Sequence, residues 1–366
     1  MNAKFSHRLA IPPQMRWRVY PIRDFDRFTA QWNALNAAAG DLPFLRSEFL
    51  APALREFGTG TETLVTFGAG DDYVAMGMLK RVRPGMWETF QPSQLPLGAF
   101  LLRKGTSVDE ILEGLLRALP GVAVAVGLTQ QDPAVVERPA DSVLVETLDY
   151  IETATLTLEG TFDDYWATRG KNLKHNVKRQ RAKLVEQSVP LKLDMIDTPE
   201  RVSAAIADYG RLEGSGWKAK QGTAVGLDNA QGRFYCSVFE TYCRLGAGRI
   251  FRYHFGDQVV AMDLCIESGP VLVVLKTTYD EKVKVVSPAT LMRHEIMNRL
   301  FDEGRIRRVE FYGKAMEWHL RWTNDLRTLY HVNRYRWSGL KRLRFALGHT
   351  RREPPVEAGA AASKGA

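Results

Sequence analysis

Cysteine, long apolar runs and an even spread of charge are all scarce in this sequence. Three cysteines in 366 residues cannot form a disulfide framework, and they lack the spacing of a metal site, so we expect buried thiols and no metal centre. No apolar run approaches the ~20 residues of a membrane-spanning helix. No apolar core of signal-peptide length precedes Pro12. These absences predict a cytoplasmic protein.

The net charge of +8 lies almost entirely at the C-terminal end of the chain. Residues 327–366 hold nine bases and two acids, whereas residues 1–326 hold 41 bases and 40 acids. A nearly neutral body argues against a nucleic-acid-binding protein whose whole surface is basic. An apolar share of 45% is enough for a sizeable core, and the length fits about two domains of ~150 residues each.

Alternating and helical periodicities divide the chain into two α/β units. After an irregular leader at residues 1–16, residues 17–150 have the pattern β-α-α-β-β-β-α-β. Residues 151–335 show a similar order of strands and helices. We therefore predict a mixed-sheet α/β fold built from two tandem units, followed by a basic C-terminal segment at residues 336–366.

Two segments place basic residues at helical spacing. Between residues 171 and 183 they are Lys171, Lys174, Lys178 and Arg181. A solvated helix face is the ordinary interpretation, and an anionic substrate, a nucleotide sugar or a tRNA is the alternative. Because no aromatic residues are interleaved, binding of single-stranded nucleic acid is not favoured.

The second segment, residues 337–347, predicts a short basic amphipathic helix. Its apolar residues are Trp337, Leu340, Leu343, Ala346 and Leu347, with Lys341, Arg342 and Arg344 between them. Such a helix suits an anionic membrane surface, which would place the protein at the periphery of the inner membrane, or a groove on a partner. The alternative is a helix docked on its own domain. Beyond His349 the Pro, Ala, Gly and Ser content predicts disorder.

The second half of the chain contains an ordered series of distinctive segments. They are FDDYWATRGKNLKHNVKRQRAKL from Phe162, RLEGSGWKAKQGTA from Arg211, VLKTTYDEKVKVVSPATLMRHE from Val274 and FYGKAMEWHLRW from Phe311. The series resembles the GNAT-superfamily acetyltransferases found with bacterial cellulose and exopolysaccharide genes, which are related to the Fem-type aminoacyltransferases. The resemblance covers roughly residues 162–335. The stretch from Trp32 to Leu50 fits more weakly and agrees with two tandem GNAT-like units.

The resemblance implies acyl transfer from acetyl-coenzyme A or another acyl-coenzyme A to an acceptor, usually an amine. It assigns cofactor binding to the strand at 271–278 and to the helix start that follows. The residues concerned are Lys276, Ser287, Pro288, Ala289 and Thr290. Unpaired N–H groups and the helix dipole favour phosphate at such a position, which Ser287 could cap. The sequence lacks the Gly-rich pyrophosphate loop of typical GNAT enzymes, so an ordinary capped helix is the alternative.

Three residues are candidates for catalysis. Glu213 could accept a proton from the attacking amine. Asp263, between Ala261 and Cys265 in a predicted strand, could also be the base if partial burial raises its pKa, and a solvated carboxylate is the alternative. Tyr279 lies in a lysine–tyrosine–aspartate run that resembles the family's, and could protonate the leaving thiolate unless it is a packed aromatic.

Four residues are candidates for acceptor binding. Trp217 and Lys218 lie in a Gly-rich loop, and loops carry binding groups on a rigid scaffold. Lys314 and His319 lie in a segment that the resemblance places beside the site. The alternatives are a connecting loop with Trp217 packed on the core, and a structural His319.

The sequence thus predicts an acyl-coenzyme A-dependent N-acyltransferase of polysaccharide or cell-envelope metabolism, acting on a small-molecule or sugar acceptor. Two alternatives stay open. One is a Fem-type transferase that uses aminoacyl-tRNA, and the other is a non-catalytic GNAT-like module of a polysaccharide biosynthesis assembly.

Overall fold

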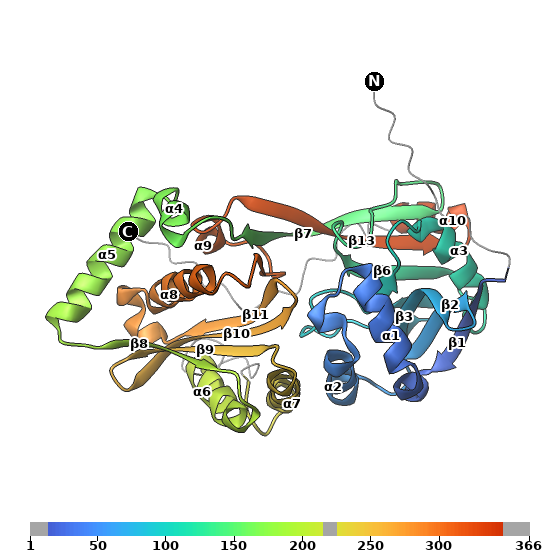
Figure 1. The fold of residues 1–366 in the computed structure, drawn as a ribbon. Coiled ribbons are helices and arrows are strands. Elements are labelled where there is room, and N and C mark those ends of the chain that lie inside the picture. The colour runs from blue at the N-terminus through green and yellow to red at the C-terminus, as the bar shows by residue number, and fades with distance from the viewer. Residues whose placement is uncertain (1–13, 215–224, 347–366) are drawn as a thin grey trace. The chain divides into compact units, whose positions relative to one another are not determined.

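The computed structural model describes residues 14–214 and 225–346 (Figure 1). Trp217 and Lys218 lie outside the described residues, as do most of the leader and the end of the tail. Contacts divide the chain into two compact units. Among the described residues, unit 1 comprises 14–152 and 328–346, and unit 2 comprises 153–214 and 225–327. The chain therefore returns to unit 1 at Thr328, whereas the sequence-based division kept residues up to 335 in the second unit.

Unit 1 is a mixed sheet with helices packed against it. In spatial order its strands are β1 (Arg16–Pro21), β2 (Thr63–Ala69), β3 (Asp72–Arg83), β4 (Met86–Thr89), β6 (Ala125–Gln131) and β13 (Asp325–Tyr335), and β5 (Phe100–Leu102) pairs with β3. Its helices are η1 (Ile22–Phe28), α1 (Thr29–Ala39), η2 (Pro43–Leu45), α2 (Ser47–Phe57), α3 (Val108–Ala118) and α10 (Ser338–Ala346). β4 and β6 are parallel, whereas β6 and β13 are antiparallel.

Unit 2 contains the strand order β7-β12-β11-β10-β9-β8, in which β7 begins in unit 1 and continues into unit 2 at Thr153. Its strands are β7 (Val145–Thr157), β8 (Leu191–Ile196), β9 (Gly248–Phe255), β10 (Gln258–Ser268), β11 (Val271–Tyr279) and β12 (Arg308–Glu310). Its helices are α4 (Phe162–Ala167), α5 (Lys171–Glu186), η3 (Pro199–Arg201), α6 (Val202–Gly214), α7 (Ala230–Arg244), η5 (Glu281–Val286), α8 (Pro288–Glu303) and α9 (Glu317–Leu320). The predicted mixed α/β fold is confirmed.

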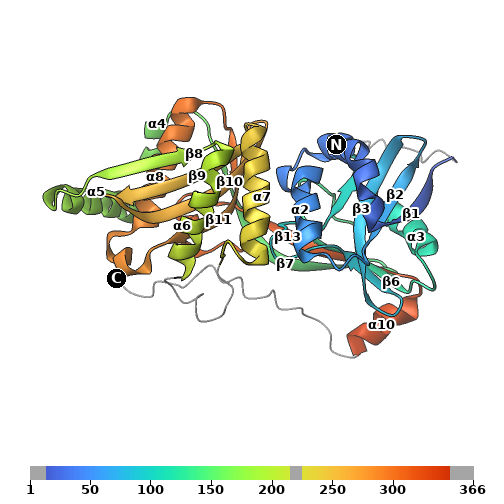
Figure 2. The ribbon, with the colours of Figure 1, turned by 90° about the horizontal axis from the view of Figure 1, so that it is seen from below.

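The helices of unit 2 lie on both faces of its sheet. Helices α4, α5 and α8 cover one face, and α6 and α7 cover the other (Figures 1 and 2). The apolar residues of the α8 face form one core cluster with inward-facing residues of the strands, among them Phe251, Ala261 and Cys265. We call these two sides the α8 face and the α6–α7 face.

Both ends of helix α8 carry strong local sequence signals. Pro288 occupies the first helical position, where its missing N–H group costs nothing. Gly304 ends the helix with a φ of +62°, which glycine adopts without steric cost. This helix follows β11 through η5, so its first turn lies close to the end of that strand.

Strand β11 separates from β12 halfway along its length. The two strands pair in parallel only from Val271 to Val273. β12 ends at Glu310, and the N–H group of Phe311 donates to Ala154 O instead. On the other side of β11, its register with β10 shifts by one residue. Cys265 pairs with Val274 and Leu264 pairs with Lys276, so Leu275 has no partner in β10. Within the described residues, the second half of β11 therefore has only β10 as a strand neighbour.

The described residues bear on two further expectations. Cys243 and Cys265 are buried and Cys236 is partly buried, and all three are free thiols. Burial raises the pKa of Cys236 and of Cys243 to about 11, so both remain protonated. Among the helices that the structure describes, none is both long enough and apolar enough to cross a membrane.

Candidate functional site

Glu213 and Lys276 form an ion pair on the α6–α7 face. Lys276 Nζ donates to Glu213 Oε1 at 3.2 Å, and Glu213 Oε2 accepts a hydrogen bond from the N–H group of Val225 at 2.9 Å. The Glu213 side chain is 2% exposed and the Lys276 side chain is 19% exposed. The lysine side chain is therefore partly accessible, whereas the carboxylate is buried.

Two tyrosines and a glutamine complete this cluster. Lys276 Nζ lies 5.7 Å from the ring centre of Tyr209 and 5.4 Å from that of Tyr235, within the range of a cation–π interaction. Gln231 Oε1 lies 3.5 Å from the same ammonium. Burial, and then the nearby Glu213 carboxylate, raise the pKa of Tyr209 well above 10. The phenol is therefore a neutral hydrogen-bond donor, and it donates to Thr277 O at 3.2 Å.

Local structure explains why these side chains meet. Helix α6 ends at Gly214, which places Glu213 in its last turn, and α6 packs on β11 whereas α7 packs on β9 and on α6. Lys276 points to the α6–α7 face although Val274 faces the α8 core, because Leu275 is an extra residue in the pairing with β10 and reverses the alternation of the strand. The Lys276–Glu213 cluster thus lies beside the half of β11 that has separated from β12.

Asp263 lies on the α8 face, opposite Glu213. Its Oδ2 accepts a hydrogen bond from Arg293 of α8 at 2.8 Å, and both side chains are almost fully buried. Arg293 also stacks on Trp318, with its guanidinium carbon 4.2 Å from the ring centre. Asp263 is therefore not the accessible, partly buried base that the sequence suggested. The ion pair favours a structural role for Asp263, anchoring α8 to β10.

Tyr279 also lies on the α8 face, at the end of β11. It packs against the core cluster there and is half-buried. Burial, and then the charge of Glu281, raise its pKa above 10. The phenol therefore holds its proton at neutral pH and can donate it. The two candidates for base and acid, Glu213 and Tyr279, consequently flank β11 from opposite faces.

The start of α8 differs from the predicted capped helix. Ser287 occupies the N-cap position with a φ of +51°, and its side chain does not cap the helix. Its Oγ instead accepts a hydrogen bond from Asn176 Nδ2 of α5 at 3.3 Å. Pro288 is buried, whereas Ala289 and Thr290 are partly exposed. Lys282 and Lys284 are exposed on η5 immediately before this helix.

The two described candidates for acceptor binding differ in accessibility. Lys314 is exposed. His319 is buried, and its Nδ1 accepts a hydrogen bond from the N–H group of Met316 at 2.9 Å. Burial, and then the charge of Arg293, lower the pKa of His319 to about 3. A neutral, enclosed imidazole favours the structural interpretation of His319.

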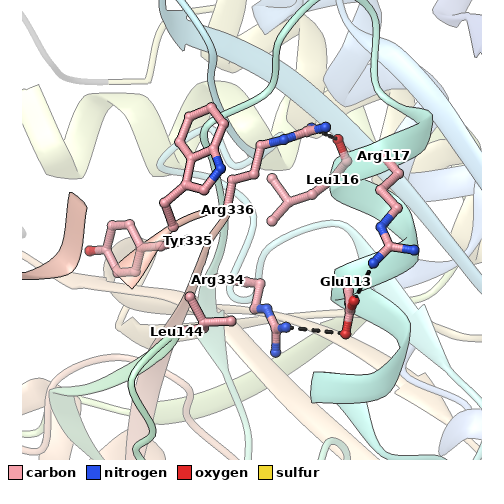
Figure 3. Close-up of a pocket in the computed structure, with 8 residues that line it drawn as sticks. Glu113, Leu116, Arg117, Leu144, Arg334, Tyr335 and Arg336 are labelled. Carbon is pink, nitrogen blue, oxygen red and sulfur yellow. Dashed lines mark hydrogen bonds and ion pairs between the residues drawn. The ribbon is translucent and has the colours of Figure 1, made fainter. Parts of the chain in front are cut away.

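A cavity of about 220 Å³ lies in unit 1, whereas the residues above belong to unit 2. Its lining consists of Glu113, Leu116, Arg117, Leu144, Arg334, Tyr335, Arg336 and Trp337 (Figure 3). Glu113 accepts from Arg334 at 3.3 Å, and Leu116 O accepts from Arg336 at 3.2 Å. The cavity is smaller than the roughly 300–1,000 Å³ of drug-sized ligand pockets. No sequence-predicted site residue lines it.

Sequence reasoning missed several residues of the two clusters. Three of them, Tyr209, Gln231 and Tyr235, lie on amphipathic helices. Helical periodicity alone accounts for their positions, and no local pattern links them to Lys276. Arg293 is one of many bases in the chain, and only the buried aspartate in β10 hinted that a buried cation must exist nearby.

Residues 171–320 match the model of a family described as an acetyltransferase (GNAT) domain. The matched segment covers 150 of the 366 residues and lies in unit 2, so the class of protein that it supports is an acyltransferase with a GNAT-like domain in that unit. No curated protein matches the chain.

Solved structures share the fold at low sequence identity. The C-terminal domain of a putative lysylphosphatidylglycerol synthetase from Agrobacterium fabrum is 11% identical, with 88% of this chain and 95% of that chain covered and a TM-score of 0.53. FemX is 9% identical, with 86% and 98% covered and a TM-score of 0.54. A tandem GNAT protein from the clavulanic acid biosynthesis pathway is 13% identical, with 87% and 98% covered and a TM-score of 0.43. The first two support the same fold for the whole chain.

Proposed function

We propose that the protein transfers an acyl group from an acyl-coenzyme A thioester to an acceptor amine at β11. The observation that carries the proposal is the separation of β11 from β12 after Val273, beside the Lys276–Glu213 cluster. A strand edge without a neighbouring strand offers N–H and C=O groups to an extended ligand, such as a pantetheine arm. The start of α8, with Lys282 and Lys284 before it, is the proposed phosphate site.

The proposed reaction assigns one role to each face of β11. Glu213, on the α6–α7 face, takes a proton from the acceptor amine as its nitrogen attacks the thioester carbonyl. A backbone N–H group of β11 stabilises the oxyanion that forms. When the C–S bond breaks, Tyr279 on the α8 face protonates the leaving thiolate. The products are an amide and a free thiol, with Glu213 protonated and Tyr279 deprotonated until they exchange protons with water.

Lys276 has a supporting role in this proposal. Its ammonium holds the Glu213 carboxylate in place through the hydrogen bond of 3.2 Å. The lysine side chain is also partly accessible, so it can contact the acceptor. Trp217 and Lys218, outside the described residues, and exposed Lys314 remain proposed acceptor contacts.

Two finer proposals concern biological context. The resemblance to acetyltransferases associated with cellulose and exopolysaccharide supports a small-molecule or sugar acceptor in polysaccharide or cell-envelope metabolism. The C-terminal segment is proposed to contact an anionic membrane surface, a proposal that the exposed Trp337 and Arg342 support.

Calorimetric titration with acetyl-coenzyme A and with longer acyl-coenzyme A species tests the proposal. We expect saturable binding of at least one species, weakened in Lys282→Glu/Lys284→Glu but not in a matched variant of unit 1, Arg23→Glu/Lys104→Glu. Absence of binding to a correctly folded protein would overturn the proposed donor. It would favour either an aminoacyl-tRNA donor or a non-catalytic module.

A further inference from the structure

Helix α5 carries a one-sided excess of positive charge. Its 16 residues include six lysines and arginines and one acid, Glu186. Four of the bases are exposed and form no ion pair within the described part of the chain: Lys171, Lys178, Arg179 and Lys183. We call these four, together with exposed Lys282 and Lys284 of η5, the basic surface. Like charges gathered without partners attract an anionic ligand.

The basic surface borders the proposed donor site. Asn176, in the middle of α5, contacts Ser287 at the start of α8. Arg181 forms an ion pair with Glu295 on the next turns of α8, so α5 is fixed along that helix. Figure 1 shows α5 along the outer side of α8 in unit 2. Any ligand that reaches β11 past the start of α8 therefore passes the bases of α5 and η5.

The extent of the surface indicates a macromolecular ligand. At 1.5 Å per residue, a helix of 16 residues is about 24 Å long. The exposed bases extend from Lys171 at its first position to Lys183 in its last turn. The phosphates of one coenzyme A molecule are clustered at one end of that molecule and leave most of this length without a counter-charge.

We propose that the basic surface docks an acidic acyl carrier protein, whose phosphopantetheine thioester is the acyl donor. This proposal rests on the proposed function and specifies its donor. The carrier's arm presents the same thioester to β11 as coenzyme A does. The C–S bond breaks and the C–N bond forms as before, and the carrier leaves as the free thiol with the proton from Tyr279.

Apolar residues within the basic surface favour a protein over a nucleic acid. Val185 of α5 is 74% exposed and Val285 of η5 is 71% exposed. Protein interfaces combine apolar contacts with complementary charges, and the charges mainly steer association. The described side chains of α5 include no Phe, Tyr or Trp on which a base could stack.

Binding of an acyl carrier protein to the full chain tests this proposal. The probe is a bacterial acyl carrier protein loaded with a short acyl chain, measured by interferometry at low and at moderate salt, with acyl-coenzyme A of the same chain length measured in parallel. The variant is Lys178→Glu/Arg179→Glu/Lys183→Glu. Its control carries the same charge change in unit 1, Arg23→Glu/Arg27→Glu/Lys104→Glu, at exposed residues.

We expect the α5 variant to weaken carrier-protein binding at least tenfold while the affinity for acyl-coenzyme A changes less than threefold. The control variant should bind both donors like the wild type. Equal weakening for both donors would overturn the proposal and assign the bases to nucleotide phosphates. Binding of acyl-coenzyme A without any binding of the carrier, or displacement of the carrier by tRNA from the same bases, would also overturn it. Binding of neither donor would overturn the proposed function itself.

Discussion

Lys276 Nζ lies 3.2 Å from Glu213 Oε1, and this pair joins the end of α6 to the middle of β11. The carboxylate is buried and the lysine side chain is partly exposed, so an acceptor approaching from the α6–α7 face meets Lys276 first. Glu213 has a second contact, the N–H group of Val225, that holds it in place. The pair holds a carboxylate at a fixed position beside β11, and a general base must be positioned within reach of the proton that it takes.

Replacing Glu213 with glutamine should abolish most of the transferase activity. The amide keeps the size of the side chain but cannot accept the proton, so we expect kcat/KM to fall by about 10²–10⁴-fold. Steady-state kinetics with acyl-coenzyme A measures the loss. The exposed Glu200 of η3 provides the matched control, because Glu200→Gln removes a carboxylate remote from β11. Wild-type turnover in Glu213→Gln would remove it from the mechanism.

Replacing Tyr279 with phenylalanine should lower kcat more than it changes KM for the donor. The raised pKa of Tyr279 keeps its phenol protonated to above pH 10, so the wild type should retain its general acid throughout the neutral range. Loss of that acid should cost about 10²-fold or more in kcat. Tyr253→Phe on the same face is the control, because the Tyr253 hydroxyl has no hydrogen-bond partner within the described residues. Equal kcat values for the two variants would contradict the assignment.

Replacing Arg293 with methionine should destabilise the fold. It leaves Asp263 as a buried charge without its partner, which typically costs about 3–5 kcal/mol in unfolding free energy. The double variant Asp263→Asn/Arg293→Met should recover part of this loss. Arg117→Met, which breaks an exposed pair with Glu113, should cost at most ~1 kcal/mol. Urea unfolding followed by circular dichroism separates these cases, and a mild effect of Arg293→Met would argue against the anchoring role.

His319 should make the protein less stable in mild acid. Its folded pKa is about 3, below the 6.5 of an unfolded histidine, so below pH 6.5 the unfolded chain binds the extra proton. Stability therefore falls as the pH drops from 6.5 towards 3, by about 2 kcal/mol from this residue at pH 5. His319→Gln should flatten the profile in this window, whereas exposed His175→Gln should not. If wild type and His319→Gln lose stability equally between pH 6.5 and pH 3, the predicted effect of His319 is refuted.

The C-terminal segment allows a test that separates docking from membrane contact. Lys341 Nζ donates to Ser142 O at 2.6 Å and to Val145 O at 2.7 Å, which attaches α10 to unit 1. Lys341→Met should therefore cost about 1–3 kcal/mol in stability. A chain that ends at Tyr335 should lose sedimentation with phosphatidylglycerol vesicles if residues 337–347 contact a membrane. Unchanged sedimentation would leave docking as the function of this segment.

Sequence signals were sufficient where local chemistry determines the structure. Pro288 and Gly304 define α8 at both ends, and the turn at Gly256 separates β9 from β10. Sequence signals were insufficient for side-chain ion pairs between residues that are far apart in the sequence. Asp263 and Arg293 are 30 residues apart, and Glu213 and Lys276 are 63 apart. Strand alternation gave each side chain two possible faces, and only packing of α6 or α8 against the sheet decides between them.

The roles of the site residues were also only partly predictable from the sequence. The resemblance of the ordered segments to GNAT-superfamily acetyltransferases implied acyl transfer, and the polar residues in those segments supplied candidates for a base, an acid and a phosphate site. Burial was not predictable from spacing: both carboxylates are 2% exposed, and they differ in the partner, because the Lys276 side chain is 19% exposed and the Arg293 side chain 4%. The unexpected conformation of Ser287 depends on Asn176, which belongs to another helix.

The return of β13 to unit 1 sets the order in which the chain can fold during synthesis. The described residues of unit 2 end at Arg327, whereas unit 1 at that point still lacks the residues of β13 that pair with β6. Until Tyr335 emerges, the edge of β6 remains exposed and open to incorrect pairing. The transferase unit, although second along the sequence, can therefore be the first to finish folding, and a fragment ending at residue 152 would lack a strand of its own sheet.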